Sequence, residues 1–240
     1  MNAIEVVGLT AGHGGVPAVR DLHIQVGAGE VVALLGPTGA GKSTTIRAVS
    51  GLTGVLGGSV HLFGADVTST SVRTRVRCGL ATVAEDRGVF TQLTVAENLR
   101  LGARRPRADL PLDDWFPSLV PLLRRRAGLL SGGEQTLLAL ARAIRSRPAA
   151  LLVDELTIGL AAGWVGAARN ALRRASAEWG TGVLLAEPRA LVALDTADRA
   201  YLLGRGQVVF EGPTADLARR PDLLESTYFG DLAGTEVPPK

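Results

Sequence analysis

The sequence predicts an α/β fold built on a parallel sheet that is covered on both sides. Three unbroken apolar runs, EVVALLG, AALLVDEL and GVLLAEP, are typical of buried parallel strands, and helix-like stretches separate them. Strands that alternate with helices favour this class of fold. A chain of 240 residues with 46% hydrophobic residues is long enough to bury a sizeable core in one large domain or two small ones.

The N-terminal elements follow in chain order. IEVVGLTAG and LHIQVGAGE are short β-like runs that end in glycine turns, and GSVHLFGADV alternates in the manner of an edge strand. Between them, EVVALLGPTGAGKSTTIRAVSGL predicts a buried strand, a glycine loop and a helix that ends at Gly51. CGLATVAED predicts a further buried strand.

The second half begins with helical periodicity from Thr94 to about Arg147, which four prolines interrupt. AALLVDEL and GVLLAEP follow as strands, and RAYLLGRGQVVFEG predicts a hairpin that turns at 204–206. The last residues, GTEVPPK, are expected to fray.

The composition indicates the cellular compartment of the protein and the kinds of partner it could bind. A single cysteine, Cys78, suits a reducing compartment, and the sequence shows neither a signal peptide nor a membrane-spanning run. Arginine clusters occur at 104–105, 124–126 and 173–174, but aromatic residues make up only 4%, so solvated helix faces are favoured over nucleic-acid binding. We expect a cytoplasmic protein that reaches a membrane only through a partner.

A phosphate-binding loop is the most specific local motif. Gly36, Gly41, Lys42 and Ser43 match G-x-x-x-x-G-K-[ST] between a predicted strand and a predicted helix. Backbone N–H groups of such a loop surround an anion, while the lysine reaches the outer phosphates and the serine hydroxyl ligates Mg²⁺. This motif alone leaves kinases, GTPases and motor ATPases open. The predicted ATP-binding residues are Gly36, Pro37, Thr38, Gly39, Ala40, Gly41, Lys42, Ser43 and Thr44.

Lys42 is unusual in this chain. Only Lys42 and Lys240 are lysines, whereas the chain has 24 arginines. An ammonium on a flexible stem is more compact than a planar guanidinium. We expect the curled loop to leave room for lysine and not for arginine.

Two carboxylates end the strand ALLVDE. A parallel strand that ends beside the phosphate loop would bring Asp154 to Mg²⁺, and Glu155 could act as the general base that orients a water for attack on the γ-phosphate. A strand that simply ends in solvated acids is the alternative, and the upstream phosphate loop makes the catalytic interpretation the better one.

The segment LSGGEQ indicates which family of nucleotide-binding proteins the chain resembles. By itself it predicts a helix start, with Ser131 as N-cap and Glu134 in the first turn. Together with GPTGAGKST and RPAALLVDE, however, it resembles the signature of the ABC-type ATPases, over about residues 3–232.

The resemblance implies a fold and a mode of assembly. It implies an ABC ATP-binding domain at 1–233 with an N-terminal antiparallel β subdomain and a helical signature subdomain at about 92–147, followed by a flexible tail at 234–240. Two such domains would pack head to tail, and ATP with Mg²⁺ would lie between the phosphate loop of one and the signature of the other. The signature residues are Ser131, Gly132, Gly133 and Glu134.

Further segments narrow the resemblance. VAEDRGVFTQLTVAENLRLGA and ADRAYLLGRGQVVFEG are similar to the smaller ATPase subunit of branched-chain amino acid importers, whose relatives include urea and short-amide importers. This implies an ATPase at the inner face of the cell membrane whose partners are a second ATPase subunit, permease subunits and, indirectly, a solute-binding protein. Phe90 and Leu93 are candidate permease contacts, with core packing as an equal alternative.

Four positions depart from the general family pattern. His13 stands where an aromatic residue usually stacks on adenine, and Glu85 stands where a glutamine usually ligates Mg²⁺. Leu156 replaces a proline, and Pro188 replaces a histidine that contacts the γ-phosphate. We therefore expect slow hydrolysis. The alternative function is the weakly hydrolysing, degenerate half of a heterodimer; a soluble ABC ATPase of translation or DNA repair is disfavoured by the chain length.

Overall fold

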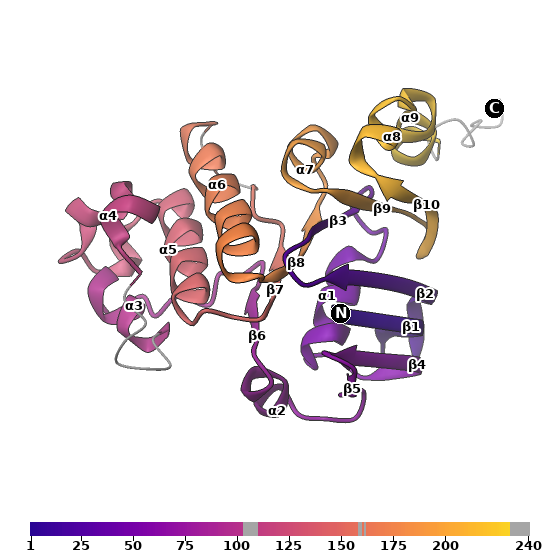
Figure 1. The fold of residues 1–240 in the computed structure, drawn as a ribbon, viewed down its shortest axis with the longest axis horizontal. Coiled ribbons are helices and arrows are strands. Elements are labelled where there is room, and N and C mark those ends of the chain that lie inside the picture. The colour runs from indigo at the N-terminus through magenta and orange to yellow at the C-terminus, as the bar shows by residue number, and fades with distance from the viewer. Residues whose placement is uncertain (103–109, 158–159, 161, 231–240) are drawn as a thin grey trace, which may run out of the picture.

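The computed structural model describes residues 1–102, 110–157, 160 and 162–230, and it confirms the α/β fold (Figure 1). The strands are β1 (Asn2–His13), β2 (Val16–Gly27), β3 (Val31–Leu35), β4 (Val55–Leu62), β5 (Ala65–Asp66), β6 (Leu80–Val83), β7 (Ala150–Asp154), β8 (Gly182–Glu187), β9 (Arg199–Gly204) and β10 (Gln207–Pro213). The α-helices are α1 (Lys42–Ser50), α2 (Val72–Arg77), α3 (Val95–Gly102), α4 (Leu112–Trp115), α5 (Gly132–Arg145), α6 (Ala162–Trp179), α7 (Ala190–Thr196), α8 (Thr214–Ala218) and α9 (Pro221–Phe229), with 3₁₀ helices at Pro117–Leu122 and Ala127–Leu129.

The central sheet places the ends of three neighbouring strands at one edge. Its strand order is β10-β9-β3-β8-β7-β6, and every neighbouring pair is parallel except β10 with β9. Leu35 of β3 pairs with Glu187 of β8, and Asp154 of β7 pairs with Ala186. The segments that follow β3, β8 and β7 therefore lie side by side at the carboxyl edge, which is where parallel sheets bind ligands.

A second sheet, ordered β2-β1-β4-β5, is antiparallel and confirms the predicted β subdomain. Its first two strands are longer than the predicted runs: β1 begins two residues before IEVVGLTAG and ends at His13, and β2 begins at Val16, six residues before LHIQVGAGE. The prediction of an edge strand at GSVHLFGADV is wrong in detail: β4 lies inside the sheet, between β1 and the two-residue β5.

Two hydrophobic cores cover the two faces of the central sheet. On one face, α1 lies between the central and antiparallel sheets, and Ile46 and Val49 pack there against strand residues such as Leu9 and Leu34. On the other face, α5, α6 and α7 bury residues such as Leu137 against the alternate side chains of the same strands. Alternation along β3 therefore serves both cores, and the expected cover on both sides is confirmed.

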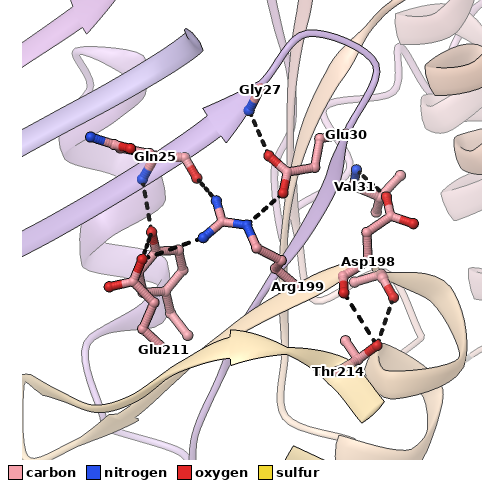
Figure 2. Close-up of polar contacts among 10 residues, drawn as sticks. Gln25, Gly27, Glu30, Val31, Asp198, Arg199, Glu211 and Thr214 are labelled. Carbon is pink, nitrogen blue, oxygen red and sulfur yellow. Dashed lines mark hydrogen bonds and ion pairs between the residues drawn. The ribbon is translucent and has the colours of Figure 1, made fainter. Parts of the chain in front are cut away.

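An arginine network joins the two sheets (Figure 2). The Arg199 guanidinium donates to the Glu30 carboxylate at 2.6 Å, to the backbone oxygen of Gln25 at 2.8 Å and to Glu211 at 3.3 Å. Tyr201 donates to Glu211 at 2.9 Å and accepts from the Gln25 N–H at 3.1 Å. These side chains fix β2 of one sheet against β9 and β10 of the other.

The helical region packs against α6 through a tryptophan pair. The rings of Trp115 and Trp179 stack with centroids 4.5 Å apart, and guanidinium groups lie over both outer faces, that of Arg174 on Trp115 and that of Arg147 on Trp179. Arg174 also forms ion pairs with Asp114 and Glu178, so this arginine links α6 to the helical region. The predicted cluster at 104–105 and the predicted tail at 234–240 lie outside the described residues. Within the described ranges, no helix combines the length and apolarity needed to cross a bilayer.

Candidate nucleotide site

The predicted phosphate loop connects β3 to α1 and has the backbone shape that its glycines allow. Gly41 precedes α1 with φ of 102°, and a Cβ there would lie 2.2 Å from Cγ1 of Val19. Gly36 begins the loop with φ of 148°, and a Cβ there would lie 2.5 Å from the backbone oxygen of Leu203. Only glycine fits at either position, so the loop is curled as the motif predicted.

Lys42 begins α1 and lies almost entirely under the loop, with 3% of its surface exposed. Its Nζ donates to the backbone oxygens of Gly36 and Pro37, each at 2.8 Å. Burial lowers the pKa of this ammonium, while the carboxylates of Glu155 and Asp154 oppose that shift. The ammonium thus lies within the curl of the loop and faces a cluster of acids.

Ser43 and Asp154 meet as the sequence predicted. The Ser43 hydroxyl donates to Oδ1 of Asp154 at 3.0 Å, although 111 positions separate the two residues. Burial raises the pKa of Asp154 to about 6, and the hydrogen bond from Ser43 acts in the opposite direction. A hydroxyl and a carboxylate at this distance form a set of hard oxygen donors of the kind that Mg²⁺ prefers.

The other predicted metal residue, Glu85, lies near this pair without a hydrogen bond to it among the described residues. Its carboxylate forms an ion pair with Arg47 of α1, with 3.6 Å between the charged atoms. Glu85, His13 and Asp154 line one cavity of about 680 Å³. His13 ends β1 as an exposed side chain, so the structure brings it to the cavity that Asp154 also lines.

Glu155 has a strained backbone. Its φ is 53°, in the left-handed region that residues other than glycine rarely adopt, and its N–H donates to the backbone oxygen of Ala186 at 2.9 Å. Strain of this kind is concentrated at functional sites. Leu156, which follows, is buried in the core, so this residue anchors the turn by packing where proline would have fixed its φ. The rest of the predicted loop at 158–159 and 161 lies outside the described residues.

Glu187 is a buried carboxylate that sequence reasoning missed. It is fully buried, and it accepts from the Thr157 hydroxyl at 2.6 Å, from the Thr157 N–H at 3.2 Å and from the Arg189 N–H at 3.2 Å. Burial raises its pKa against these three hydrogen bonds. Glu187 therefore ties the turn after Glu155 to the loop that carries the half-buried Pro188. An acid that ends the apolar run GVLLAE, as Asp154 ends ALLVD, was the available signal.

The signature segment begins α5 with a reciprocal cap. The Ser131 N–H donates to the Glu134 carboxylate at 2.6 Å, and the Glu134 N–H donates to the Ser131 hydroxyl at 3.3 Å. The predicted N-cap is confirmed, and the helix starts at Gly132. In the part of the chain that the structure describes, no hydrogen bond joins Ser131 or Glu134 to the phosphate loop.

Arg87 connects the loop that carries Glu85 to the signature helix, and the sequence gave no signal for it. Its φ of 63° is also left-handed, its Nε donates to the Thr136 hydroxyl at 3.0 Å, and its guanidinium reaches Gln135 at 3.4 Å. Arg87, Glu85 and Glu155 line a smaller cavity of about 180 Å³. The loop after β6 is therefore attached directly to the first turns of α5.

The candidate permease contacts differ in exposure. Phe90 is 54% exposed and its ring lies 5.5 Å from the Arg142 guanidinium, whereas Leu93 is half-buried. The buried Asn98 fixes this segment, because its amide bonds both the N–H and the backbone oxygen of Phe90, at 2.9 Å and 3.0 Å. Phe90 thus presents an apolar ring to solvent on a well-anchored loop, as the contact hypothesis requires.

The fold and this loop define the class of protein: a P-loop nucleoside triphosphatase with a capped signature helix. A family model described as "ABC transporter" matches residues 19–158. The chain belongs to the ABC transporter family, and it is an ATP-binding and ATP-hydrolysing member, as the resemblance implied.

Two similar proteins have curated names. The high-affinity branched-chain amino acid transport ATP-binding protein BraG of Pseudomonas aeruginosa is 36% identical over 91% of this chain and 95% of its own length. The probable branched-chain amino acid transport ATP-binding protein LivF of Archaeoglobus fulgidus is 34% identical over 95% of this chain and 97% of its own length. These names give no support to the alternative of a degenerate, weakly hydrolysing half.

Solved structures agree with the fold. A structure titled as the ATP-binding subunit of an ABC transporter has a TM-score of 0.80 at 27% identity, over 96% of this chain and 98% of that one. A nucleotide-free ATP-binding cassette from an ABC transporter also has a TM-score of 0.80, at 25% identity, over 94% of this chain and 98% of that one.

Proposed function

We propose that the chain is the ATPase subunit of a membrane importer for branched-chain amino acids or a related small amide. The observation that carries the catalytic part is the approach of the Ser43 hydroxyl to the Asp154 carboxylate at 3.0 Å, directly below the curled loop and one residue before the strained Glu155. This arrangement supports ATP phosphates on the loop and an acid that reaches their outer end.

Lys42 and the loop amides provide the phosphate contacts in this proposal. The ammonium already lies within the curl, so binding of ATP requires it to exchange two backbone oxygens, of Gly36 and Pro37, for phosphate oxygens. The amino end of α1 adds about half a positive charge. Glu155 then acts as general base on the attacking water, with its backbone fixed by its bond to Ala186 and the turn after it fixed by the bond between Thr157 and Glu187.

Ser43, Asp154 and Glu85 would hold Mg²⁺, and these residues fit the ion because all three offer oxygen donors and two of them already touch. The ion would neutralise charge that develops on the phosphates. Glu85 must leave Arg47 to take part, and a surface ion pair of this kind costs only about 0–1 kcal/mol to break.

The signature residues Ser131, Gly132, Gly133 and Glu134 would bind ATP held by a second ATPase subunit. Their support is geometric: the amino end of α5 is capped and Ser131 and Gly132 are exposed, while the described residues include no bond from this end to the loop of the same chain. An anion at a helix amino terminus is favoured by the aligned backbone dipoles. A second copy or a related subunit can supply that anion.

The transport role rests on the similar proteins. Both BraG and LivF are named for branched-chain amino acid transport, and each is covered almost completely by this chain. The exposed Phe90 loop would contact permease subunits at the inner face of the cell membrane, where the ATPase would be peripheral. Solute choice would lie with the permease and a binding protein.

The test of catalysis is Glu155→Gln. It removes the base but keeps the size of the side chain, so turnover should fall by about 100-fold or more while ATP affinity stays within about twofold. Glu225→Gln, an exposed acid on α9, is the matched control and should change neither quantity. Unchanged turnover in Glu155→Gln would refute the assigned role.

The test of transport is uptake by vesicles that contain the chain together with the permease subunits and the solute-binding protein of its transport system. ATP-dependent uptake of labelled leucine, isoleucine or valine is expected, with urea and acetamide as the competing substrates. Uptake of urea or acetamide alone would assign the related class, and absence of ATP-dependent uptake of all five would contradict the importer.

A further inference from the structure

The C-terminal helix contacts the first residue of the phosphate loop. The Tyr228 hydroxyl, on α9, accepts a hydrogen bond from the Gly36 N–H at 3.1 Å, across 192 positions of sequence. No motif of the phosphate loop includes this residue, and the proposed catalytic steps do not use it.

The N–H, the backbone oxygen and the Cα of Gly36 are all held by neighbouring groups. Its oxygen accepts from Lys42 at 2.8 Å, and its N–H donates to Tyr228. A Cβ on this residue would lie 2.5 Å from the oxygen of Leu203 and 3.0 Å from Cβ of Ala40, so the main chain lies tightly against β9 and the loop. If Lys42 turns to the phosphates when ATP binds, Tyr228 becomes the remaining polar contact described for the Gly36 peptide.

The hydrogen bond between Gly36 and Tyr228 lies in a buried environment, which raises the cost of losing it. Gly36 is buried, and burial raises the pKa of the Tyr228 phenol to about 12. A buried N–H that loses its acceptor retains the full cost of its desolvation. Removal of the hydroxyl therefore favours a backbone arrangement in which Gly36 reaches another acceptor, and such an arrangement differs from the curled loop.

The helix that carries Tyr228 is attached lightly. None of its residues is fully buried, and Leu223, Leu224 and Tyr228 pack only partly against the core. Elements with few buried contacts open with small free energies. A force that displaces α9 would thus reach the phosphate loop through one hydrogen bond.

We propose that Tyr228 is a positioning residue for ATP: its hydroxyl fixes the entrance of the phosphate loop, so that α9 sets the affinity for nucleotide. This inference rests on the proposed function, because it assumes that Gly36–Thr44 bind ATP phosphates. It assigns to Tyr228 an effect on binding and none on the chemical step, since the hydrogen bond described for the phenol goes to Gly36 and not to Glu155.

The chain contains a matched control. Only Tyr201 and Tyr228 are tyrosines, and the Tyr201 hydroxyl also accepts a backbone N–H, that of Gln25, at 3.1 Å. Its bond joins the two sheets and involves no residue of the phosphate loop. The substitutions Tyr228→Phe and Tyr201→Phe each remove a bond from a backbone N–H at 3.1 Å, and Tyr201→Phe also removes the bond to Glu211, so a general loss of stability affects both.

The experiment measures binding of a non-hydrolysable ATP analogue with Mg²⁺ and steady-state ATP hydrolysis in the full chain. Tyr228→Phe should weaken the analogue's affinity and raise KM about three- to tenfold, with kcat within about twofold of the wild type. Tyr201→Phe should leave Kd and KM unchanged. Equal Kd values in the two variants, or a fall in kcat without a change in Kd, would overturn the proposal.

Two further measurements keep the outcome decisive. If Tyr228→Phe does not fold, hydrogen exchange of the Gly36 amide in the wild type replaces it: protection above that of the exposed Gly39 is expected, and equal exchange overturns the proposal. Lys42→Ala separates this proposal from the proposed function. If the wild type and Lys42→Ala bind the analogue equally, the ATP site is refuted and Tyr228 is not the cause.

Discussion

The hydrogen bond between Thr157 and Glu187 gives the sharpest prediction about the catalytic turn. The substitution Thr157→Val keeps the branched shape of this buried side chain and removes only its hydroxyl. The Glu187 carboxylate would then keep two backbone donors, of Thr157 and Arg189, each at 3.2 Å, and lose its shortest bond, at 2.6 Å. Glu155 lies two residues before Thr157 with a strained φ of 53°, so the loss acts on a backbone that needs support.

The magnitude follows from the chemistry of that bond. A hydrogen bond to a charged group contributes about 1.5–3 kcal/mol, and Glu187 is fully buried, so we expect Thr157→Val to lower the free energy of unfolding by this amount. Relaxation of Glu155 toward a common φ would move its carboxylate away from the attacking water. A misplacement of about 1 Å can cost about 100-fold in rate, and we expect a fall in kcat of about tenfold or more.

The assays are urea unfolding and phosphate release at saturating ATP. Thr157→Ser retains the hydroxyl and should restore both quantities to near the wild type. Thr181→Val is the matched control: Thr181 is equally buried, but its hydroxyl donates to the neutral backbone oxygen of Pro148 at 2.7 Å. It should cost about 0.5–1.5 kcal/mol and leave kcat unchanged. Equal effects of Thr157→Val and Thr181→Val on turnover would refute the reasoning.

Three more predictions concern the surroundings of the site. Arg75 is buried and donates to the backbone oxygens of Ala48, Val49 and Thr68, so Arg75→Met should cost about 2–4 kcal/mol in urea unfolding, whereas Arg73→Met on the exposed side of the same helix should cost under about 0.5 kcal/mol. Asp154→Asn should stabilise the Mg²⁺-free protein by up to about 3 kcal/mol above pH 6, because the pKa of Asp154 is raised from 3.8 to about 6 and the folded protein therefore disfavours the charged carboxylate. This gain in stability should vanish as the pH falls toward 4. Equal gains in thermal unfolding at pH 8 and at pH 4 would contradict the prediction. Pro188→His should raise turnover about tenfold, since it adds a donor where the family's γ-phosphate contact lies, and an unchanged rate would show that Pro188 is not the limit.

Local patterns predicted most of the fold. The phosphate loop, the cap at Ser131 and the hairpin after β9 depend on residues that are close in sequence, and each is found as predicted. The error at β4 has a different cause. A two-residue strand, β5, completes the sheet beside it, and so short a segment leaves no periodicity to read.

The candidate site was predictable where a motif fixes chemistry and not where distant side chains meet. Ser43 and Asp154 were expected to meet because parallel strands end at one edge, and they do. Arg87 gave no signal, because its contact with Thr136 depends on a left-handed backbone at a residue that shows no such preference. Glu187 looked like the polar end of a strand, and only its complete burial marks it as structural support.

Lys42 and Tyr228 show the same difference at a single residue, Gly36. Both side chains bind Gly36, Lys42 from six positions away and Tyr228 from 192. The chain has 24 arginines and only two lysines, and we expect the compact ammonium that donates to the oxygens of Gly36 and Pro37 to fit within this curl better than a planar guanidinium. In the proposed mechanism ATP draws Lys42 away from the oxygen of Gly36, while Tyr228 keeps its bond to the Gly36 N–H. A substitution at this far end of the chain would then tune nucleotide affinity without altering the motif.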